Sequence, residues 1–419
     1  MDIGLNKEIK TKAVLISVNE DMTEEQVESS LNELERLLET AGGEAVARII
    51  QNRPSPDKAT YIGSGKVKEI AEFIKNSEEN IELAVFDNEL SPSQIANLEE
   101  GLGVRVIDRT MLILDIFALH ATTGEGKLQI EIACLRYSAP RLMGKGAQMS
   151  RLGGGIGTRG PGESKLESDR RHLKRRIAAL TAELESLDKT RAVKRTAREK
   201  SGIKTAAIIG YTNAGKSTLL NYLTNAGILA EDKLFATLDP TTRRLTLPSG
   251  NEILLTDTVG FIDRLPTHLI KAFKSTLDEL KYADIIINLT DASEPDVERR
   301  KKQAVTERLV EELGAKEKPM VRVFNKIDKA VDTEFIPKDA LTISALNGDG
   351  IDKLLAKLDT FAADGKKTLE LFFPHALQAK TADVYRLAKV ISVEYTDDGT
   401  VITAECDERA QGVFKDFIN

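Results

Sequence analysis

Short apolar runs alternate with amphipathic segments over residues 1–122. The apolar runs at 13–18, 45–50, 83–86 and 104–107 predict strands, and the segments at 24–39, 66–75, 92–100 and 111–120 predict helices. Because one helix separates each strand from the next, this alternation favours a largely parallel sheet. The pattern therefore predicts an N-terminal α/β domain over residues 1–122.

Residues 123–203 show a different pattern, a stripe of apolar residues at helical spacing. The stripe consists of Leu166, Leu173, Ile177, Leu180, Leu184 and Leu187. Intervals of seven, four and three residues keep it on one face of a helix of coiled-coil type, which needs a partner. The preceding segment 127–137 has Leu128, Ile132 and Leu135 at helical spacing, so we predict an antiparallel helical hairpin. The Gly-rich segment 140–162 between the helices is predicted to be a loop, either a flexible linker or a tip that contacts nucleic acid.

Two further domains are predicted from the remaining pattern. Strand-like runs at 206–209, 253–255, 320–324 and 341–343 separated by helical segments predict an α/β domain over residues 204–366. After that, runs at 369–373, 390–395 and 401–406 with a helix at 376–388 predict a small α+β domain over residues 367–419. Two to four domains suit a chain of 419 residues.

Charge is concentrated in the hairpin. The chain carries a net charge of −7, yet residues 136–204 hold 18 Lys and Arg against 7 Asp and Glu. Such a block can attract a polyanion in a salt-dependent way; the alternative is an unused solvated helix face. The candidate RNA-binding residues are Arg141, Lys145, Arg151, Arg159, Arg170, Arg171, Lys174, Arg175 and Arg176. No apolar run is long enough to span a bilayer and no signal segment is evident, so we expect a cytoplasmic protein, a monomer in solution.

One motif identifies the ligand class. The stretch Gly210, Tyr211, Thr212, Asn213, Ala214, Gly215, Lys216 and Ser217 matches the phosphate loop G-x-x-x-x-G-K-[ST] and follows a predicted strand. Its backbone N–H groups can surround phosphate oxygens, Lys216 can reach the outer phosphates, and Ser217 can ligate Mg²⁺. The chain is therefore predicted to bind a nucleoside triphosphate.

A second motif selects the base. Asn325, Lys326, Ile327 and Asp328 follow the predicted strand 320–324 and resemble the N-K-x-D motif of GTPases. The Asp328 carboxylate can accept two hydrogen bonds from guanine, and adenine offers no such donor pair. Ser344, Ala345 and Leu346 resemble the segment whose backbone contacts the guanine carbonyl.

Two further segments complete the order of motifs in a GTPase. Asp257, Thr258, Val259 and Gly260 follow a strand, so Asp257 can hold water on Mg²⁺ while the Gly260 N–H meets the γ-phosphate. The expected switch segment contains Phe235, Ala236, Thr237, Leu238 and Asp239, followed by Pro240, Thr241 and Thr242. One of its threonines is expected at Mg²⁺ when the γ-phosphate is present.

Together these motifs resemble HflX, a family of ribosome-associated GTPases. The most specific parts are the Gly-Thr-Arg-Gly-Pro-Gly-Glu stretch at 157–163 and the switch segment at 235–242. The resemblance implies binding to the large ribosomal subunit and its rRNA, GTP hydrolysis stimulated there, and splitting or rescue of stalled or stress-inactivated ribosomes.

The resemblance also implies residue roles. Thr237 is the switch threonine, so Lys216, Thr237 and Gly260 are the candidate catalytic residues, with Ser217, Thr237 and Asp257 (through water) at Mg²⁺. Phe261 stands where Ras-like enzymes use a water-orienting glutamine, so we expect slow hydrolysis by the protein alone. Asn213 is placed like the phosphate-loop asparagine of potassium-stimulated GTPases, which makes assistance by K⁺ a further hypothesis; equal rates in K⁺ and Na⁺ would contradict it.

Two other functions stay open at this point. Ile62-Gly-Ser-Gly-Lys66 opens a predicted helix in the N-terminal domain and could hold a phosphate, although it is short of a full phosphate loop. An ATP-driven RNA remodeller would use that domain as its engine, and some members of the HflX family are reported to bind ATP there. A GTP-gated, non-enzymatic RNA-binding module would use GTP only as a structural ligand.

Overall fold

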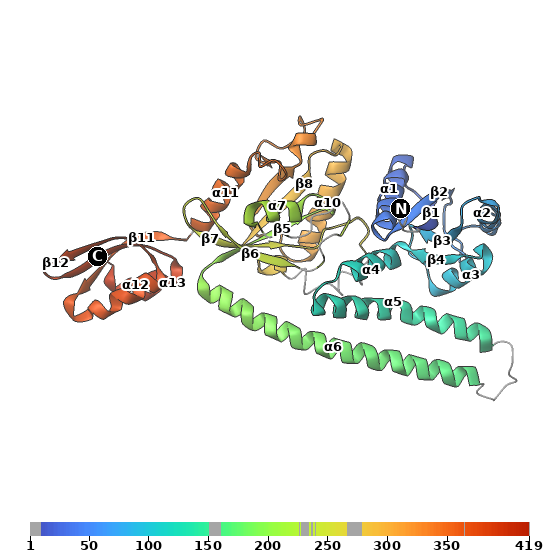
Figure 1. Ribbon diagram of the computed structural model, residues 1–419, viewed down its shortest axis with the longest axis horizontal. Helices are drawn as coiled ribbons and strands as arrows, with labels where there is room; N and C mark the ends of the chain where they lie inside the picture. Colours follow the sequence, from blue (N-terminus) through green and yellow to red (C-terminus); the bar gives the residue numbers. More distant parts are fainter. Residues whose placement is uncertain are drawn as a thin grey trace, which may run out of the picture.

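The computed structural model describes residues 10–150, 161–225, 227, 234–235, 238, 240–265, 279–363 and 365–418. Within its helices, the side chains of 141–150, 161–167, 191–192, 194–201 and 408–409 are not described. The described parts form an elongated molecule with the N-terminal and C-terminal domains at opposite ends (Figure 1). The chain is of the α/β class, as predicted.

The N-terminal domain is a four-stranded, entirely parallel sheet, as the alternating pattern predicted. Its strands are β1 (Thr11–Asn19), β2 (Gly43–Asn52), β3 (Ile81–Phe86) and β4 (Arg105–Asp108), in the order β2-β1-β3-β4. The helices are α1 (Glu24–Thr40), α2 (Ser64–Asn76), α3 (Pro92–Leu102) and α4 (Arg109–His120).

Both faces of this sheet are covered, which explains why β1 is apolar throughout its centre. Ala13 and Leu15 pack with the apolar side chains of α1 and α4, whereas Val14 and Ile16 pack with those of α2 and α3. Such two-sided burial is typical of parallel sheets. Helix α1 begins with a capping box in which Thr23 and Gln26 bond each other's backbone N–H groups. The capping box therefore fixes where α1 begins, and with it which side chains of α1 face the sheet.

The hairpin consists of α5 (Gly124–Ser150) and α6 (Pro161–Ser201), which lie side by side in Figure 1. Leu180 of α6 is buried, and Arg176 of α6 donates two hydrogen bonds to Glu131 of α5, at 2.7 and 3.0 Å. One prediction was wrong: residues 140–150 continue α5 and do not form a loop. Pro140 removes one backbone donor, and helix formers such as Leu142 and Ala147 follow it. The rest of the predicted loop, 151–160, lies outside the described residues.

The third part is a six-stranded sheet in the order β10-β9-β8-β5-β7-β6. Its strands are β5 (Lys204–Gly210), β6 (Thr241–Thr246), β7 (Glu252–Asp257), β8 (Ile285–Asp291), β9 (Met320–Asn325) and β10 (Leu341–Thr342). Only β6 is antiparallel to its neighbour among these strands. Its helices include α7 (Lys216–Thr224), α10 (Asp296–Glu312) and α11 (Ile351–Ala363), with the short η1 (Ile327–Lys329). Ligands of such sheets bind at the carboxyl ends of the parallel strands.

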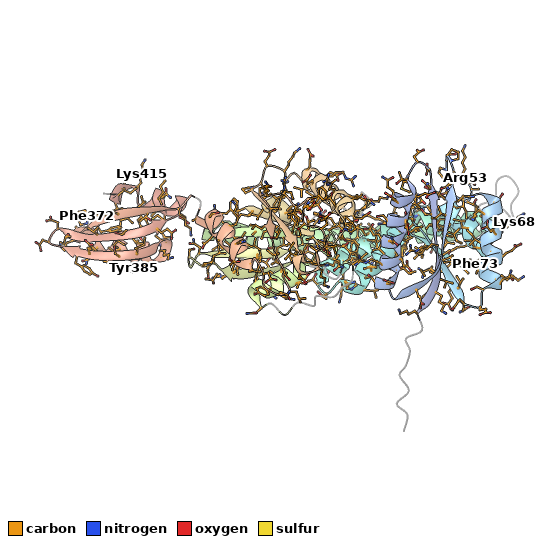
Figure 2. All side chains as sticks on the ribbon, turned by 90° about the horizontal axis from the view of Figure 1, so that it is seen from above. Arg53, Lys68, Phe73, Phe372, Tyr385 and Lys415 are labelled. Atoms are coloured by element: carbon orange, nitrogen blue, oxygen red, sulfur yellow. The ribbon has the colours of Figure 1, made fainter. Side chains whose placement is uncertain are left out.

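The C-terminal part is a small antiparallel sheet in the order β11-β13-β12, with short helices packed on it. Its elements are β11 (Lys367–Pro374), η2 (His375–Lys380), α12 (Thr381–Leu387), β12 (Lys389–Thr396), β13 (Gly399–Cys406), α13 (Glu408–Val413) and η3 (Lys415–Phe417). Figure 2 shows Phe372, Tyr385 and Lys415 at this end of the molecule, opposite Arg53, Lys68 and Phe73 of the N-terminal domain. The α+β pattern is as predicted.

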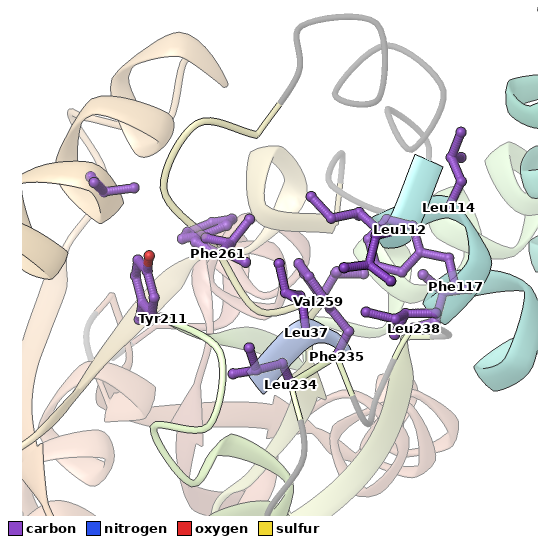
Figure 3. Packing of buried hydrophobic residues seen from close by; sticks show 14 of the residues in the cluster. Leu37, Leu112, Leu114, Phe117, Tyr211, Leu234, Phe235, Leu238, Val259 and Phe261 are labelled. Atoms are coloured by element: carbon purple, nitrogen blue, oxygen red, sulfur yellow. The ribbon is translucent and has the colours of Figure 1, made fainter. Parts of the chain in front are cut away.

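The N-terminal domain and the six-stranded domain share one hydrophobic core. Leu37 of α1 and Phe117 of α4 belong to the same buried cluster as Phe235, Val259 and Phe261 (Figure 3). The rings of Phe117 and Phe235 meet edge to face, with centroids 4.6 Å apart. We call this cluster the interdomain core. Among the described helices, none is long and apolar enough to cross a membrane.

Candidate nucleotide site

The predicted phosphate loop joins the end of β5 to the start of α7. Gly215 has a φ of +94°, which side chains rarely adopt, and a Cβ there would overlap the Asn325 side-chain amide. A Cβ at Gly210 would overlap the Leu289 carbonyl oxygen. Both positions therefore require glycine, and the loop lies against the ends of β8 and β9. Its residues precede a helix N-terminus, the arrangement that suits phosphate.

Lys216 is buried within this loop. Its Nζ donates hydrogen bonds to the carbonyl oxygens of Gly210 at 3.2 Å and Tyr211 at 3.0 Å. Burial lowers the pKa of Lys216 to about 8; the Asp257 carboxylate opposes the shift and Lys326 adds to it. The ammonium group is thus poorly compensated by the protein, and phosphate oxygens would favour its charge.

The predicted metal-binding oxygens lie together. Ser217 Oγ donates a hydrogen bond of 2.7 Å to Asp257 Oδ2, and the neighbouring Thr258 hydroxyl donates to the Ile208 carbonyl, also at 2.7 Å. A hydroxyl beside a carboxylate is an oxygen set that suits Mg²⁺. In the described parts of the chain no group of three or more His, Cys, Asp or Glu could hold a metal by itself. The residues fit an ion held mainly by nucleotide and water; Thr237 lies outside the described residues.

The segment after Asp257 lies against the phosphate loop. The Phe261 N–H donates to the Gly210 carbonyl at 3.1 Å, and the Thr212 N–H donates to the Phe261 carbonyl at 2.7 Å. A Cβ at Gly260 would lie 2.9 Å from Lys216 Nζ. Gly260 is thus next to the lysine that is expected to meet the outer phosphates. The Phe261 ring is buried in the interdomain core, so it offers no polar group to a water molecule.

Asn325 connects the base-recognition segments. Its side-chain N–H₂ donates to the Ala214 carbonyl, and its carbonyl oxygen accepts from the Ala345 N–H, both at 2.9 Å. The phosphate loop, the strand end and the Ser344 turn are therefore tied together by one side chain. Asp328 follows with an exposed carboxylate, as guanine recognition requires, and Leu346 is 70% exposed.

Lys326 and the Ser344 turn complete the edge of the site. Lys326 has a φ of +62° and forms an ion pair of 2.7 Å with Asp291. The Ile327 N–H donates to the Ile343 carbonyl at 3.2 Å, and the buried Ser344 accepts from the Asn347 N–H at 3.2 Å. These contacts hold the two base-binding turns in register.

The switch segment is described only in part. Ala236, Thr237 and Asp239 lie outside the described residues. The side chains of Phe235 and Leu238, both predicted nucleotide contacts, are buried in the interdomain core. Contacts of these two residues with a nucleotide would therefore involve their backbone.

A polar cluster on the N-terminal domain reaches the phosphate loop, and no sequence motif indicated it. Glu33 of α1 accepts a hydrogen bond from the Tyr211 hydroxyl and forms an ion pair with Arg109. Glu33 and Tyr211 are 178 positions apart, and no motif connects them. The helical period of α1 predicts which of its residues share a face, but it cannot show that Glu33 contacts Tyr211.

The predicted RNA-binding residues divide into two groups. Arg170, Arg171, Lys174, Arg175 and Arg176 are all exposed on α6. Arg141 and Lys145 lie in α5 with side chains that are not described, and Arg151 and Arg159 lie outside the described residues. Residues 170–176 of α6 thus expose five basic side chains, of which Arg176 pairs with Glu131 of α5.

A phosphate loop, an Asp257 to Gly260 turn and an Asn325 to Asp328 turn lie at the carboxyl ends of the parallel strands of one sheet. This arrangement defines a P-loop GTPase. Three family descriptions match the chain in succession: "GTP-binding GTPase N-terminal" over residues 28–118, "GTP-binding GTPase Middle Region" over 120–198, and "50S ribosome-binding GTPase" over 205–326.

Whole-length relatives specify the family. The chain is 50% identical over 403 residues to the GTPase HflX of Lacrimispora saccharolytica, covering 95% of this chain and 94% of the relative. It is 44% identical over 354 residues to the GTPase HflX of Escherichia coli, covering 83% and 82%. A GTP-binding protein of Sulfolobus solfataricus, solved with GDP, is 27% identical, with a TM-score of 0.44 and coverage of 84% and 99%. The chain belongs to the HflX family of GTPases and hydrolyses GTP.

Proposed function

We propose that this protein binds the large ribosomal subunit and its rRNA, and couples GTP binding and hydrolysis to the splitting or rescue of stalled or stress-inactivated ribosomes. The observation that carries the proposal is the exposed basic surface of α6. Only Gly202 and Ile203 separate this helix from β5, the strand that ends in the phosphate loop. A polyanion bound to the hairpin is therefore mechanically connected to the nucleotide site.

The family description supports the same partner, because the match over residues 205–326 is to ribosome-binding GTPases. Basic side chains fixed on a helix contact phosphates and give affinity that weakens with salt. Ribosome binding also implies a cytoplasmic location. A basic helix by itself would bind many RNAs, so selectivity for the ribosome requires the whole molecular surface.

The proposed roles in the site rest on the family resemblance and on the contacts described above. Lys216 binds the β- and γ-phosphates, the Gly260 N–H binds the γ-phosphate, and Asp328 selects guanine. Ser217, Thr237 and, through water, Asp257 would hold Mg²⁺, which neutralises phosphate charge when bound. Because Phe261 cannot orient water through its side chain, hydrolysis is slow until the ribosome or a K⁺ ion near Asn213 completes the site.

The test is GTP turnover with and without purified large ribosomal subunits at several salt concentrations. We expect stimulation that falls steeply with salt and is lost in Lys216→Ala. The triple variant of Arg170, Lys174 and Arg175 to Gln should lose most of the stimulation and keep the basal rate. Its control is Arg300→Gln with Arg308→Gln, which removes two positive charges from exposed arginines of another helix, α10.

Each outcome decides between the alternatives. If the control and the α6 variant lose stimulation equally, the α6 surface is not the contact. If ATP turnover survives Lys216→Ala, the N-terminal domain hydrolyses ATP independently of the GTPase site, as an ATP-driven RNA remodeller would. If a variant that binds GTP without hydrolysing it still splits subunits repeatedly, the protein acts as a GTP-gated binding module.

A further inference from the structure

Tyr211 of the phosphate loop connects three parts of the molecule through one hydroxyl. The ring is 7% exposed, and Lys302 of α10 lies over it with Nζ 5.0 Å from its centroid. The hydroxyl bonds the Glu33 carboxylate on α1 and accepts a hydrogen bond of 2.7 Å from the Asp263 N–H. The loop, the segment after Gly260 and the N-terminal domain therefore meet at this one atom.

The direction of these hydrogen bonds is fixed by protonation. Burial, then the charge of Glu33, raise the pKa of Tyr211 above its ordinary value, so the phenol keeps its proton. A carboxylate can only accept, so the hydroxyl donates to Glu33 and its lone pair accepts from Asp263. Deleting the oxygen would break both contacts.

Glu33 is itself held by charge. The guanidinium of Arg109 pairs with Glu33 and with Asp87, the latter at 2.7 Å. Burial alone would lower the pKa of Arg109, but the two carboxylates raise it above its ordinary value, so the group stays charged. Asp87 also accepts from Ser30 at 2.7 Å. The side chain of Glu33 is thus held in place by Arg109, a buried residue of the N-terminal domain.

The same carboxylate of Asp87 reaches back to the GTPase domain. Arg264 Nη1 donates to Asp87 Oδ2 at 3.1 Å, one residue after Asp263. Segment 260–264 is therefore held by the phosphate loop through Phe261 and by the N-terminal domain through Arg264, with Tyr211 between them. We call Glu33, Asp87, Arg109, Tyr211 and Arg264 the interdomain polar network.

We infer that Tyr211 is a positioning residue for GTP hydrolysis, which holds segment 260–264 so that the Gly260 N–H faces the terminal phosphate, and whose own position is set by Glu33. This inference rests on the proposed role of Gly260. On this inference, the contact between the N-terminal domain and Tyr211 helps to set the position of Gly260 during hydrolysis. Buried hydrogen bonds to a charged group are strong enough to fix such a turn.

A merely structural role for the hydroxyl predicts a different result. The interdomain core, with Phe117, Phe235 and Leu37, holds the two domains together independently of the network (Figure 3). Removing one oxygen should therefore leave domain docking intact and disturb only the turn. A structural role would instead lower stability and leave the rate per folded molecule unchanged.

The experiment uses the full chain with Tyr211→Phe. We expect kcat for basal GTP hydrolysis to fall about tenfold, because Tyr211→Phe removes the hydrogen bonds that connect the turn to Glu33, while GTP affinity changes less than about twofold. Thermal unfolding should remain a single transition. The matched control is Glu35→Gln on the same helix, because Glu35 pairs with Arg48 of β2, within the N-terminal domain; its kcat should match the unaltered protein.

A double variant tests the coupling to the N-terminal domain. Glu33→Ala alone should lower kcat, and adding it to Tyr211→Phe should cause little further loss, because both changes remove the hydrogen bond between Tyr211 and Glu33. Additive losses, an unchanged or raised kcat in Tyr211→Phe, or a loss confined to KM would each overturn the inference.

Gly260→Ala distinguishes failure of the inference from failure of the proposed site. Its Cβ would lie 2.9 Å from Lys216 Nζ, so we expect hydrolysis to be lost in a folded protein. If Gly260→Ala is inactive and Tyr211→Phe is normal, only the inference is wrong. If Gly260→Ala hydrolyses GTP at full rate, the proposed site and the inference are both wrong.

Discussion

Nucleotide affinity should fall as pH rises through 8, because the phosphate loop contains Lys216, whose side-chain amine loses its proton near that pH. Burial lowers the pKa of Lys216 to about 8 in the free protein. The phosphates of a bound nucleotide favour the charged amine and raise that pKa again. Binding above pH 8 therefore requires uptake of a proton, which costs free energy.

The magnitude follows from the fraction of Lys216 that is protonated. With a pKa of about 8, that fraction is about 0.9 at pH 7 and about 0.09 at pH 9. If the amine stays protonated in the complex, the Kd for GDP rises about tenfold between these pH values, or about 1.4 kcal/mol. At pH 8 binding should take up about half a proton.

The assay is titration of a fluorescent GDP analogue at fixed ionic strength between pH 7 and 9. Lys216→Arg is the control, because its guanidinium does not titrate in this range. The Kd of this variant for the analogue should therefore hardly change between pH 7 and 9. Calorimetry in two buffers of different ionisation heat measures proton uptake independently. Equal Kd values at pH 7 and 9, or proton release on binding, would refute the reasoning.

Three further predictions concern the base, the core and the lysine. Asp328→Asn should change the preferred nucleotide from GTP to XTP, because an amide can donate to the xanthine carbonyl that replaces the guanine amine. Competition binding measures this preference. Phe117→Ala should lower the free energy of unfolding by about 3–5 kcal/mol in urea titrations, because it leaves a cavity beside Phe235 in the interdomain core. In the free protein, the lowered pKa of Lys216 means that the unfolded chain binds more protons, so stability rises with pH from about 8 to about 10.5. Lys216→Met should remove that slope and raise the unfolding free energy at pH 7 by up to about 3 kcal/mol, checked by denaturation at pH 7 and 10 without nucleotide.

The nucleotide site could be predicted because its chemistry lies in short local segments. A phosphate loop such as Gly210 to Ser217 needs its glycines and its lysine at fixed spacing whatever surrounds it. The parallel N-terminal sheet was also predictable, because buried strands alternate with amphipathic helices. The hairpin was predicted from the stripe that includes Leu180, although its first helix continues past Pro140.

The interdomain polar network could not be predicted in this way. Glu33, Asp87 and Arg109 occur among many charged residues, and only the packed structure shows that Asp87 and Arg109 are buried and that Arg109 pairs with both carboxylates. The sequence likewise assigned Phe235 to the nucleotide, since it lies in a switch motif. Its ring contacts the N-terminal domain, because tertiary packing decides where an apolar side chain in a loop is buried.

Helix α6 gives the molecule a lever arm. Its 41 residues span about 60 Å at 1.5 Å per residue, and it is followed by Gly202, whose φ of +69° is a backbone geometry suited to glycine. A rotation of about 5° at that point would move the far end of such a helix by about 5 Å. A force on the Pro161 end of α6 would therefore act through a long arm on β5 and on the phosphate loop that follows it. Conversely, a small rotation of α6 that begins beside β5 would displace the Pro161 end of the helix by several ångströms.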